Sequence, residues 1–362
     1  MTLRVGVVGG GLVAQAMHLQ YLAAKRDRFA LVALAEPSLT VRETLGARYG
    51  IGGLHADYRS LLDAGGVDAV VVCSPHGTHA EVVLAALDAG LHVLVEKPMC
   101  ITLADADAIV AARDRTGKVV QVGTMKRFDP AVEAMLEALP GSAADLRYVS
   151  VVVNDPEFEP YFEAGEIVRG DDVPRELIER TRREESEQVE QAVGSGGEGV
   201  VRAFSESFLG SLLHDLNVVH GMLEHMGEPL PAQVVAGDWW NEGRAVYGAL
   251  RLQNGARVDG AWIQLLETFE YRETIQFMFA EEVHSLEFPS PWLKQHPTIY
   301  RRSRRDGRTN DVHIVKSYDE AFRRELLHFH GCIVDGTPCR TPPEAARLDI
   351  EVLTQMFLAA SR

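Results

Sequence analysis

The stretch VGVVGGGLVAQAMHL, residues 5–19, joins a run of valines to a run of helix formers through three consecutive glycines. Within it, Gly9, Gly11 and Ala14 form the pattern G-x-G-x-x-A. In a dinucleotide site the first glycine permits the tight turn, the second lets the backbone approach the pyrophosphate, and the small third residue lets helix and strand pack closely. The same turn also occurs without a ligand, so the rest of the chain has to decide.

The first 125 residues alternate short apolar runs with helix-like segments. The apolar runs predict strands at residues 3–9, 29–36, 67–75, 92–98 and 119–125. Valine-rich strands separated by helices imply a parallel sheet covered on both faces. We therefore expect an α/β Rossmann domain over residues 1–125.

After residue 125 the pattern changes to strand-like segments without helices between most of them. The Asn-Gly pair in QNGA, residues 253–256, is a strong hairpin signal. Helices are expected near residues 131–139, 208–226 and 319–334. Residues 126–362 are thus predicted to form an α+β domain for substrate binding and oligomerisation, built on an open, mostly antiparallel sheet.

An acidic insertion is expected at residues 155–200. Its first part, residues 155–190, holds 13 acidic residues and 5 arginines, a net charge of −8. The sequence favours a polar helix followed by a glycine-rich loop. Such an insertion is either a solvated surface segment or a mobile lid over a pocket or an arm across a subunit interface.

The net charge of −16 argues against nucleic acid and anionic membranes as partners, because both repel an acidic surface. No segment has the length of a membrane span or the pattern of a secretory leader. Cys332 and Cys339 could supply half of a metal site, but the sequence shows no His or Cys cluster to complete it, so no metal is expected. Together with Cys73 and Cys100 they are interpreted as thiols in a reducing compartment, and the chain as cytoplasmic.

Further residues at the strand ends suggest a dinucleotide. Glu36 ends the second strand, where a carboxylate can hydrogen-bond the ribose hydroxyls and would repel a 2′-phosphate, which favours NAD over NADP. Ligands of such sheets bind beyond the carboxyl ends of the strands. The expected cofactor-binding residues are Gly9, Gly11, Leu12, Val13, Glu36, Ser74, Pro75, His76, His79, Glu96, Lys97 and Pro98.

Four segments carry a resemblance to a known family. They are residues 5–22, 70–99, 120–132 and 212–223. In order and spacing they resemble the Gfo/Idh/MocA oxidoreductase family, the group of glucose–fructose oxidoreductase and inositol 2-dehydrogenase. The resemblance implies that Lys97, in the Glu96-Lys97-Pro98 element, is the lysine on the nicotinamide side, often followed by a cis bond to proline. It also implies homodimers or homotetramers.

The second catalytic element of the family is a helix that reads D-x-x-x-H, and the match puts His214 at the histidine. There it would accept the alcohol proton, while Lys97 hydrogen-bonds the same oxygen. Gly210 stands where the aspartate is expected and Asn217 where a later aspartate can occur. Asp215 lies about 100° around the helix and cannot simply replace it. The alternative for His214 is a hydrogen-bonded core histidine.

Other polar residues match positions that contact substrate hydroxyls in the family. Arg127, Asn154 and Tyr271 are the expected substrate contacts, beside Lys97 and His214; Lys126 and Glu273 are weaker candidates. Trp239 and Trp240 are adjacent on a strand, so at most one can face a given pocket. The basic stretch at residues 301–308 is interpreted as an exposed turn or interface loop.

We therefore expect an NAD(H)-dependent oxidoreductase that acts on CH–OH groups of a sugar, amino sugar, cyclitol or glycoside. Two alternatives stay open. One is a redox-assisted glycoside-cleaving enzyme that recycles its NAD, and the other is a non-catalytic NAD-binding regulator.

Overall fold

The computed structural model describes residues 1–156, 162 and 166–360, which fold into two compact units. Unit 1 comprises Met1–Thr124, Phe162–Ala192 and Phe322–Arg347, and unit 2 comprises Met125–Tyr161, Val193–Ala321 and Leu348–Arg362. The first unit thus contains two late segments that the sequence assigned to the second domain. Both segments form hydrogen bonds with residues of this unit that are distant in sequence, and local sequence patterns do not reveal such contacts.

Unit 1 is built on a six-stranded sheet in the order β3-β2-β1-β4-β5-β6, and every pairing is parallel. Its strands are β1 (Leu3–Val8), β2 (Phe29–Ala35), β3 (Gly53–His55), β4 (Ala69–Val72), β5 (His92–Glu96) and β6 (Val120–Gly123). The α/β Rossmann expectation is confirmed. The short β3 was not expected, because three residues give no periodic signal.

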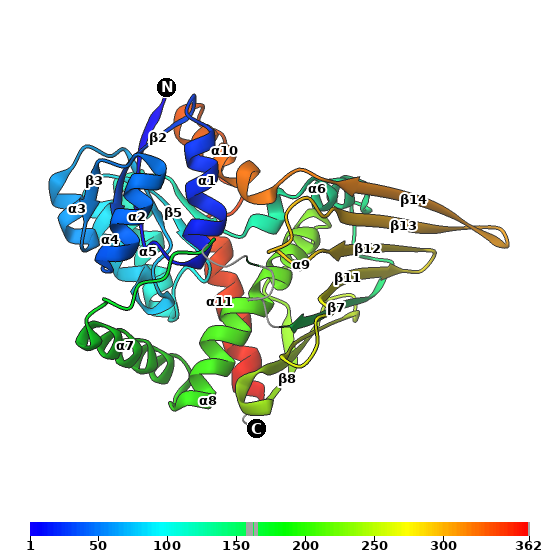
Figure 1. Cartoon of the computed structure of the whole chain (residues 1–362). Coiled ribbons are helices and arrows are strands. Elements are labelled where there is room, and N and C mark those ends of the chain that lie inside the picture. Colours follow the sequence, from blue (N-terminus) through cyan, green and yellow to red (C-terminus); the bar gives the residue numbers. More distant parts are fainter. Residues whose placement is uncertain (157–161, 163–165, 361–362) are drawn as a thin grey trace. The chain divides into compact units, whose positions relative to one another are not determined.

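Helices cover both faces of this sheet (Figure 1). They are α1 (Leu19–Ala24), α2 (Leu39–Tyr49), α3 (Tyr58–Ala64), α4 (His79–Asp88), α5 (Leu103–Thr116) and α10 (Ala321–Val334). On one face Val5 and Val7 of β1 share a buried core with Phe329 of α10. Gly6 points to the opposite face, where Leu61 of α3 packs against it. Strand alternation thus supplies two cores from one strand.

Polar caps define where several of these helices begin. Ser38, Asp57 and Thr102 each accept a hydrogen bond from a backbone N–H three residues on, at the starts of α2, α3 and α5. Gly50 and Gly117 end α2 and α5 in the left-handed conformation, with φ of 70° and 63°.

Unit 2 is built on an eight-stranded sheet in the order β14-β13-β12-β11-β7-β10-β9-β8. Its strands are β7 (Leu146–Pro156), β8 (Gln233–Trp240), β9 (Ala245–Arg251), β10 (Arg257–Leu265), β11 (Arg272–Phe279), β12 (Glu282–Phe288), β13 (Thr298–Asp306) and β14 (Thr309–Ser317). Only the β7–β10 pairing is parallel. The expected open, mostly antiparallel sheet is confirmed.

Two hairpins of this sheet test the turn predictions. QNGA joins β9 to β10, with Gly255 at φ 88° and the Leu252 N–H bonded to the Ala256 carbonyl at 3.0 Å. The basic stretch at residues 301–308 is different from the expected loop. Most of it lies in β13, which pairs with β14 from Thr298 to Asp306, and only Gly307 and Arg308 form the turn between the two strands.

The helices of unit 2 are α6 (Pro130–Ala138), α8 (Glu198–Val201), the π-helical segment η5 (Arg202–Leu212), α9 (Leu213–His225) and the part of α11 (Pro343–Ala360) from Leu348 onward. The sequence analysis missed α11. The ring of Trp239 stacks on Phe357 of α11 with 6.2 Å between centroids, whereas Trp240 is exposed. The two tryptophans therefore point to opposite faces of β8, as strand geometry requires.

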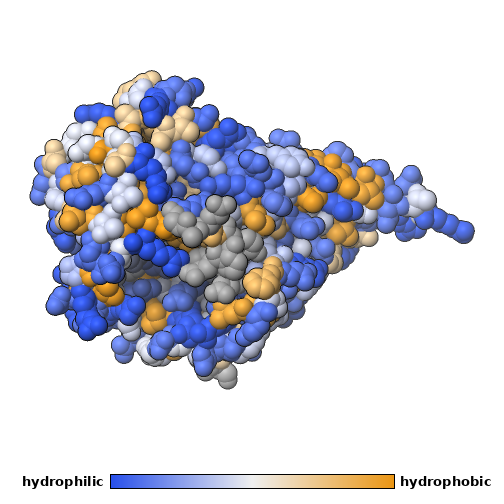
Figure 2. All heavy atoms as spheres, in the orientation of Figure 1, coloured by the Kyte–Doolittle hydropathy of each residue, from blue (hydrophilic) through white to orange (hydrophobic). Residues whose placement is uncertain are grey.

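Exposed apolar side chains share one face of the unit 2 sheet. Val152 lies in register with Thr274 and Glu287, and Val312 in register with Ser303 and Val283. Hydrophobic residues lie among hydrophilic ones on this unit in Figure 2, and the tip of the β13–β14 hairpin is hydrophilic. None of the described helices is long and apolar enough to span a membrane.

Candidate functional site

The glycine turn of unit 1 has the geometry of a phosphate cradle. Gly9 has φ of 94°, and a Cβ there would lie 2.5 Å from the carbonyl oxygen of Cys73. At Gly11 a Cβ would meet nothing within 4 Å. Ala14 is fully buried where the first helix packs on the sheet. The turn itself therefore requires glycine at position 9. The space beside the backbone of Gly11 is open, and a pyrophosphate would approach there.

Glu36 is fixed beside this turn. Its carboxylate accepts hydrogen bonds from the backbone N–H of Gly10 at 2.8 Å and of Ser38 at 2.9 Å. Only 9% of its surface is exposed. The carboxylate is therefore held at the carboxyl end of β2, next to the space in front of Gly11, where the ribose of a dinucleotide is expected.

The loop after β4 carries Ser74, Pro75, His76 and His79. Ser74 accepts a hydrogen bond from the Thr78 hydroxyl at 2.7 Å, and Pro75 is exposed. Both ring nitrogens of His79 lie 2.7 Å from backbone carbonyls, one of Pro98 and one of Ser74. Burial lowers the pKa of His79, and the hydrogen bonds to the two carbonyls oppose that shift. His79 thus joins the loops after β4 and β5.

The loop after β5 carries the Glu96-Lys97-Pro98 element, and the bond before Pro98 is cis, as the resemblance implied. Glu96 contacts Nε2 of His18 at 2.6 Å, and both side chains are buried. Burial raises the pKa of Glu96, but the hydrogen bond and charge of His18 and the charge of Lys97 outweigh it and leave the pKa lowered. Lys97 is half-buried at the same edge.

A second carboxyl group lies near this pair. Glu325 of α10 is fully buried, and its carboxyl oxygens have no hydrogen-bond partner among the described residues. Burial and the charge of Glu96 raise its pKa well above the usual value, so the fold favours its protonated form. The sequence offered no signal for it, because it lies on a helix more than 200 residues away.

The acidic insertion lies along the same edge of unit 1. Asp172 accepts hydrogen bonds from the Ser38 hydroxyl and from the Thr40 N–H. Gln15, in the helix after the glycine turn, bonds the backbone of Val168 on both sides of its amide. From α7 (Arg175–Val193), Gln188 donates to the carbonyl of Gly77 at 2.8 Å. The segment therefore contacts the loops that follow β1, β2 and β4, where the cofactor is expected.

In unit 2, His214 is the second residue of α9 and is half-buried. The next residue, Asp215, is buried and forms an ion pair with Lys126 at 3.1 Å. Burial lowers the pKa of Lys126 and raises that of Asp215. Glu273 contacts Lys126 as well, and the Tyr271 hydroxyl donates to Glu273. The structure therefore brings together three of the expected residues, Lys126, Glu273 and Tyr271, with Asp215.

Asp215 is the member of this group whose role the sequence did not indicate. Helical spacing correctly separated it from the position of Gly210, but only the tertiary structure pairs it with Lys126. The ring of Phe288 lies 4.9 Å from the Lys126 nitrogen and adds a cation–π contact.

Two other expected contacts take separate positions. Arg127 donates to the carbonyl of Asn217 at 3.2 Å and packs over Gly221, where a Cβ would lie 2.2 Å from its guanidinium. Asn154 is half-buried near the end of β7, paired with Ile263 and Arg272 on its two sides. Asn217 donates to Asp349 at 2.6 Å and is thus occupied within unit 2.

The glycine turn, the carboxylate after β2 and the parallel sheet define unit 1 as a dinucleotide-binding Rossmann unit. Residues 3–124 match the family model GFO_IDH_MocA, described as an oxidoreductase family with an NAD-binding Rossmann fold. This match agrees with the resemblance that the sequence motifs carry.

Curated relatives agree with the family. Residues of this chain are 40% identical over 148 residues to inositol 2-dehydrogenase 1 of Saccharopolyspora erythraea, covering 40% of this chain and 44% of that protein. They are 36% identical over 126 residues to D-glucoside 3-dehydrogenase of Escherichia coli, covering 35% and 36%. The matched part is thus less than half the length of these relatives.

Solved structures share the fold over the whole chain. UDP-N-acetylglucosamine 3-dehydrogenase from Acidithiobacillus ferrooxidans has a TM-score of 0.72 at 19% identity and covers 100% of this chain and 99% of its own. A 3-ketoreductase from Actinomadura kijaniata, solved with NADP, has a TM-score of 0.73 at 17% identity and covers 99% and 98%. At this identity the likeness concerns the fold.

Proposed function

We propose that this protein is an NAD(H)-dependent oxidoreductase that interconverts a secondary alcohol and a ketone on a sugar, amino sugar, cyclitol or glycoside. The observation that carries the proposal is the open space at Gly11 beside the fixed carboxylate of Glu36. A bound dinucleotide would lie along the carboxyl ends of the unit 1 strands, from the glycine turn to Lys97. Its nicotinamide ring would be the hydride acceptor.

NAD is favoured over NADP by two carboxylates. Glu36 and Asp172 both lie beside Ser38, directly after β2, where a 2′-phosphate would have to be accommodated. Two negative groups there repel a phosphate dianion. A Glu36→Gln variant is expected to narrow the preference for NAD⁺ over NADP⁺ by about tenfold in kcat/KM, which corresponds to roughly 1.4 kcal/mol.

Lys97 and His214 are proposed to manage the proton of the alcohol. Lys97 would donate a hydrogen bond to the reacting oxygen and stabilise negative charge on it, and the imidazole of His214 would accept the proton. Lys97 follows β5, and His214 is the second residue of α9.

The polar groups of unit 2 are proposed to bind the remaining hydroxyls. Lys126 with its partners Asp215 and Glu273 offers both donors and acceptors, which suits vicinal hydroxyl groups. Asn154 and Tyr271 supply further hydrogen-bonding groups. Relatives named for inositol, glucosides and an N-acetylglucosamine nucleotide support a cyclic polyol substrate. The negative charge and four free thiols support a cytoplasmic location.

The test is a screen of NAD⁺ reduction over cyclitols, free sugars and glycosides, followed at 340 nm. Lys97→Ala and His214→Ala are each expected to lower kcat by about 10²–10⁴-fold while NADH still binds. Lys25→Ala, at a half-buried lysine, and His225→Ala, at an exposed histidine, change residues outside the proposed site and should leave kcat unchanged.

Three outcomes would contradict the dehydrogenase proposal. If no compound yields NADH although NADH binds tightly, a non-catalytic regulator fits better. Cleavage of a glycoside without net NADH indicates a recycled cofactor. Undiminished turnover in both alanine variants would remove Lys97 and His214 from the mechanism.

A further inference from the structure

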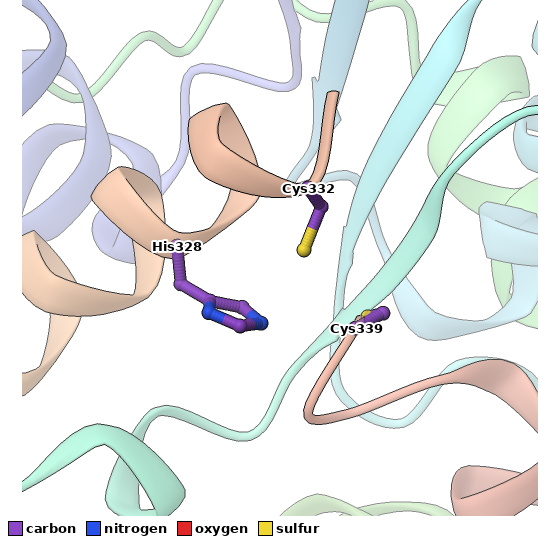
Figure 3. A group of neighbouring side chains, drawn as sticks. All are labelled: His328, Cys332 and Cys339. Atoms are coloured by element: carbon purple, nitrogen blue, oxygen red, sulfur yellow. The ribbon is translucent and has the colours of Figure 1, made fainter. Parts of the chain in front are cut away.

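Three metal-ligating side chains of unit 1 converge outside the proposed active site. His328 and Cys332 are four residues apart on α10, so they lie on one face of the helix. Cys339 follows in the segment after the helix. One potential ligand atom from each residue lies within 4.8 Å of the others. Figure 3 shows the three side chains directed toward a common space.

The backbone around Cys339 is fixed against the sheet. Two residues on, Thr341 accepts a backbone hydrogen bond from Val122 of β6 at 2.9 Å and donates its hydroxyl to the Val122 carbonyl at 2.8 Å. The Cys339 thiol donates to the carbonyl of Val120 at 3.7 Å. The third side chain of the cluster is thus held in place by strand-like pairing rather than by a free loop.

The imidazole of His328 is in a form that suits a metal. Nε2 of His328 accepts a hydrogen bond from the Arg340 N–H at 3.0 Å, so this nitrogen carries an unprotonated lone pair. Zinc binds histidine through such a lone pair and cysteine as the thiolate.

The geometry points to a zinc site formed by the thiolates of Cys332 and Cys339 and by Nε2 of His328, with water as the fourth ligand. His328 and Cys339 are both partly exposed, which gives the ion and the water access. The ion would replace the Arg340 N–H at Nε2, and any thiol protons displaced would pass to solvent.

The site would be structural. Val120, which Cys339 contacts, begins β6, whereas Gly123 at its other end pairs with Glu96. The metal would therefore lie at the amino ends of the strands, and the proposed dinucleotide edge is at the carboxyl ends. It would tie the end of α10 to the edge strand of the sheet. Its test is thus independent of turnover.

The test uses the full chain, reduced with a phosphine, freed of metal by a chelator and titrated with Co²⁺ without oxygen. We expect one equivalent to produce a near-ultraviolet thiolate-to-cobalt band and the intense visible bands of tetrahedral cobalt. Zn²⁺ should displace the cobalt stoichiometrically. Cys332→Ser and Cys339→Ser should each weaken cobalt binding at least tenfold, and His328→Ala should alter the visible bands.

Cys100→Ser is the matched control, because Cys100 is a buried thiol elsewhere in unit 1. It should keep the spectrum of the wild type, and NADH binding reports whether each variant is folded. Alkylation of the wild type needs no substitution at all. Saturating Zn²⁺ should slow iodoacetamide modification of Cys332 and Cys339 at least tenfold.

The zinc proposal is wrong if the reduced wild type gives only the spectrum of octahedral cobalt without a thiolate band. It is also wrong if the Cys332→Ser/Cys339→Ser double variant still binds cobalt. Alkylation rates unaffected by zinc would also overturn it. So would a Cys332–Cys339 disulfide recovered from protein kept reduced with excess zinc.

Discussion

Gly9 and Gly11 lie in one turn but have different roles, stability at Gly9 and cofactor binding at Gly11. Mutations at the two positions should therefore have different effects. Gly9→Ala adds a Cβ 2.5 Å from a backbone oxygen at φ of 94° and should lower the free energy of unfolding by roughly 1–3 kcal/mol. Gly11→Ala adds a Cβ in open space and should leave stability within about 0.5 kcal/mol. It should instead weaken NADH binding about tenfold or more.

Denaturant unfolding and NADH fluorescence titration measure the two effects. Each variant is the control for the other, because both add one methyl group to the same turn. Equal loss of stability in the two variants would contradict the separation, and unchanged NADH binding in Gly11→Ala would place the pyrophosphate elsewhere.

Glu325 gives a pH-dependent prediction. Burial, and then the charge of Glu96, raise its pKa in the fold above the value of 4.5 for an unfolded chain. An acid with a raised folded pKa binds its proton more tightly when folded. Its contribution is therefore fully present below pH 4.5 and is lost as the pH rises toward the folded pKa. The loss is up to about 1.4 kcal/mol per pH unit.

Glu325→Gln keeps the size of the side chain and removes the titration. The free energy of unfolding of this variant relative to the wild type should therefore rise as the pH increases from 5 to 8. Asp88→Asn, at an exposed acidic residue, provides the control and should show no such trend. A difference that is flat with pH would mean that Glu325 is ionised in the fold.

At the scale of elements, the acidic segment has two kinds of surface. Most of α7 is polar and exposed, as its composition predicted, but Asp172 and Gln188 attach the segment to loops of unit 1. Those loops follow β2 and β4. A segment held there by a few hydrogen bonds can open without unfolding the sheet, and we propose that it acts as a lid over the cofactor.

The Asp172→Ala/Gln188→Ala double variant tests the lid. Hydrogen exchange should accelerate several-fold across residues 166–192, and NADH should dissociate faster, with little change in the melting temperature. Glu187→Ala removes only an exposed pair with Arg183 on α7 and should change neither. A double variant with unaltered exchange and dissociation would show that the segment is no lid.

At the scale of the whole molecule, the open face of the unit 2 sheet suggests an interface between subunits. Val152, Val283, Val312 and Ile314 are exposed and share this face by strand register. Exposed apolar side chains on a broad sheet are typical of surfaces that another copy covers. We therefore predict a homodimer or homotetramer that uses this face.

Val312→Glu/Ile314→Glu should shift the mass measured by light scattering toward that of the monomer, because each carboxylate would have to be buried without a partner. Leu39→Glu, at an exposed leucine of α2 in unit 1, is the matched control. A mass unchanged in the double variant would exclude this face as the interface, and a monomeric wild type would contradict the prediction altogether.

Local patterns were sufficient for the parallel sheet, the hairpin at Asn254-Gly255 and the polar helix α7, because strand periodicity, turn chemistry and charge act within about 20 residues. They also identified the glycine turn and Glu36, whose roles follow from backbone geometry at the end of a strand. The helix α11 and the strands β13 and β14 were missed. Pro343 and Glu344 at the start of α11 are a helix-start signal that the sequence analysis did not use. Arginines obscured β13.

The sequence by itself therefore determined the class of fold and the glycine turn with Glu36 beside it. Only the tertiary structure decided that Asp215 pairs with Lys126, that Glu325 lies beside Glu96, and that His328 completes a cluster with two cysteines. In each case the groups come from different elements of the chain. Their chemistry arises from burial and proximity, which no local spacing encodes.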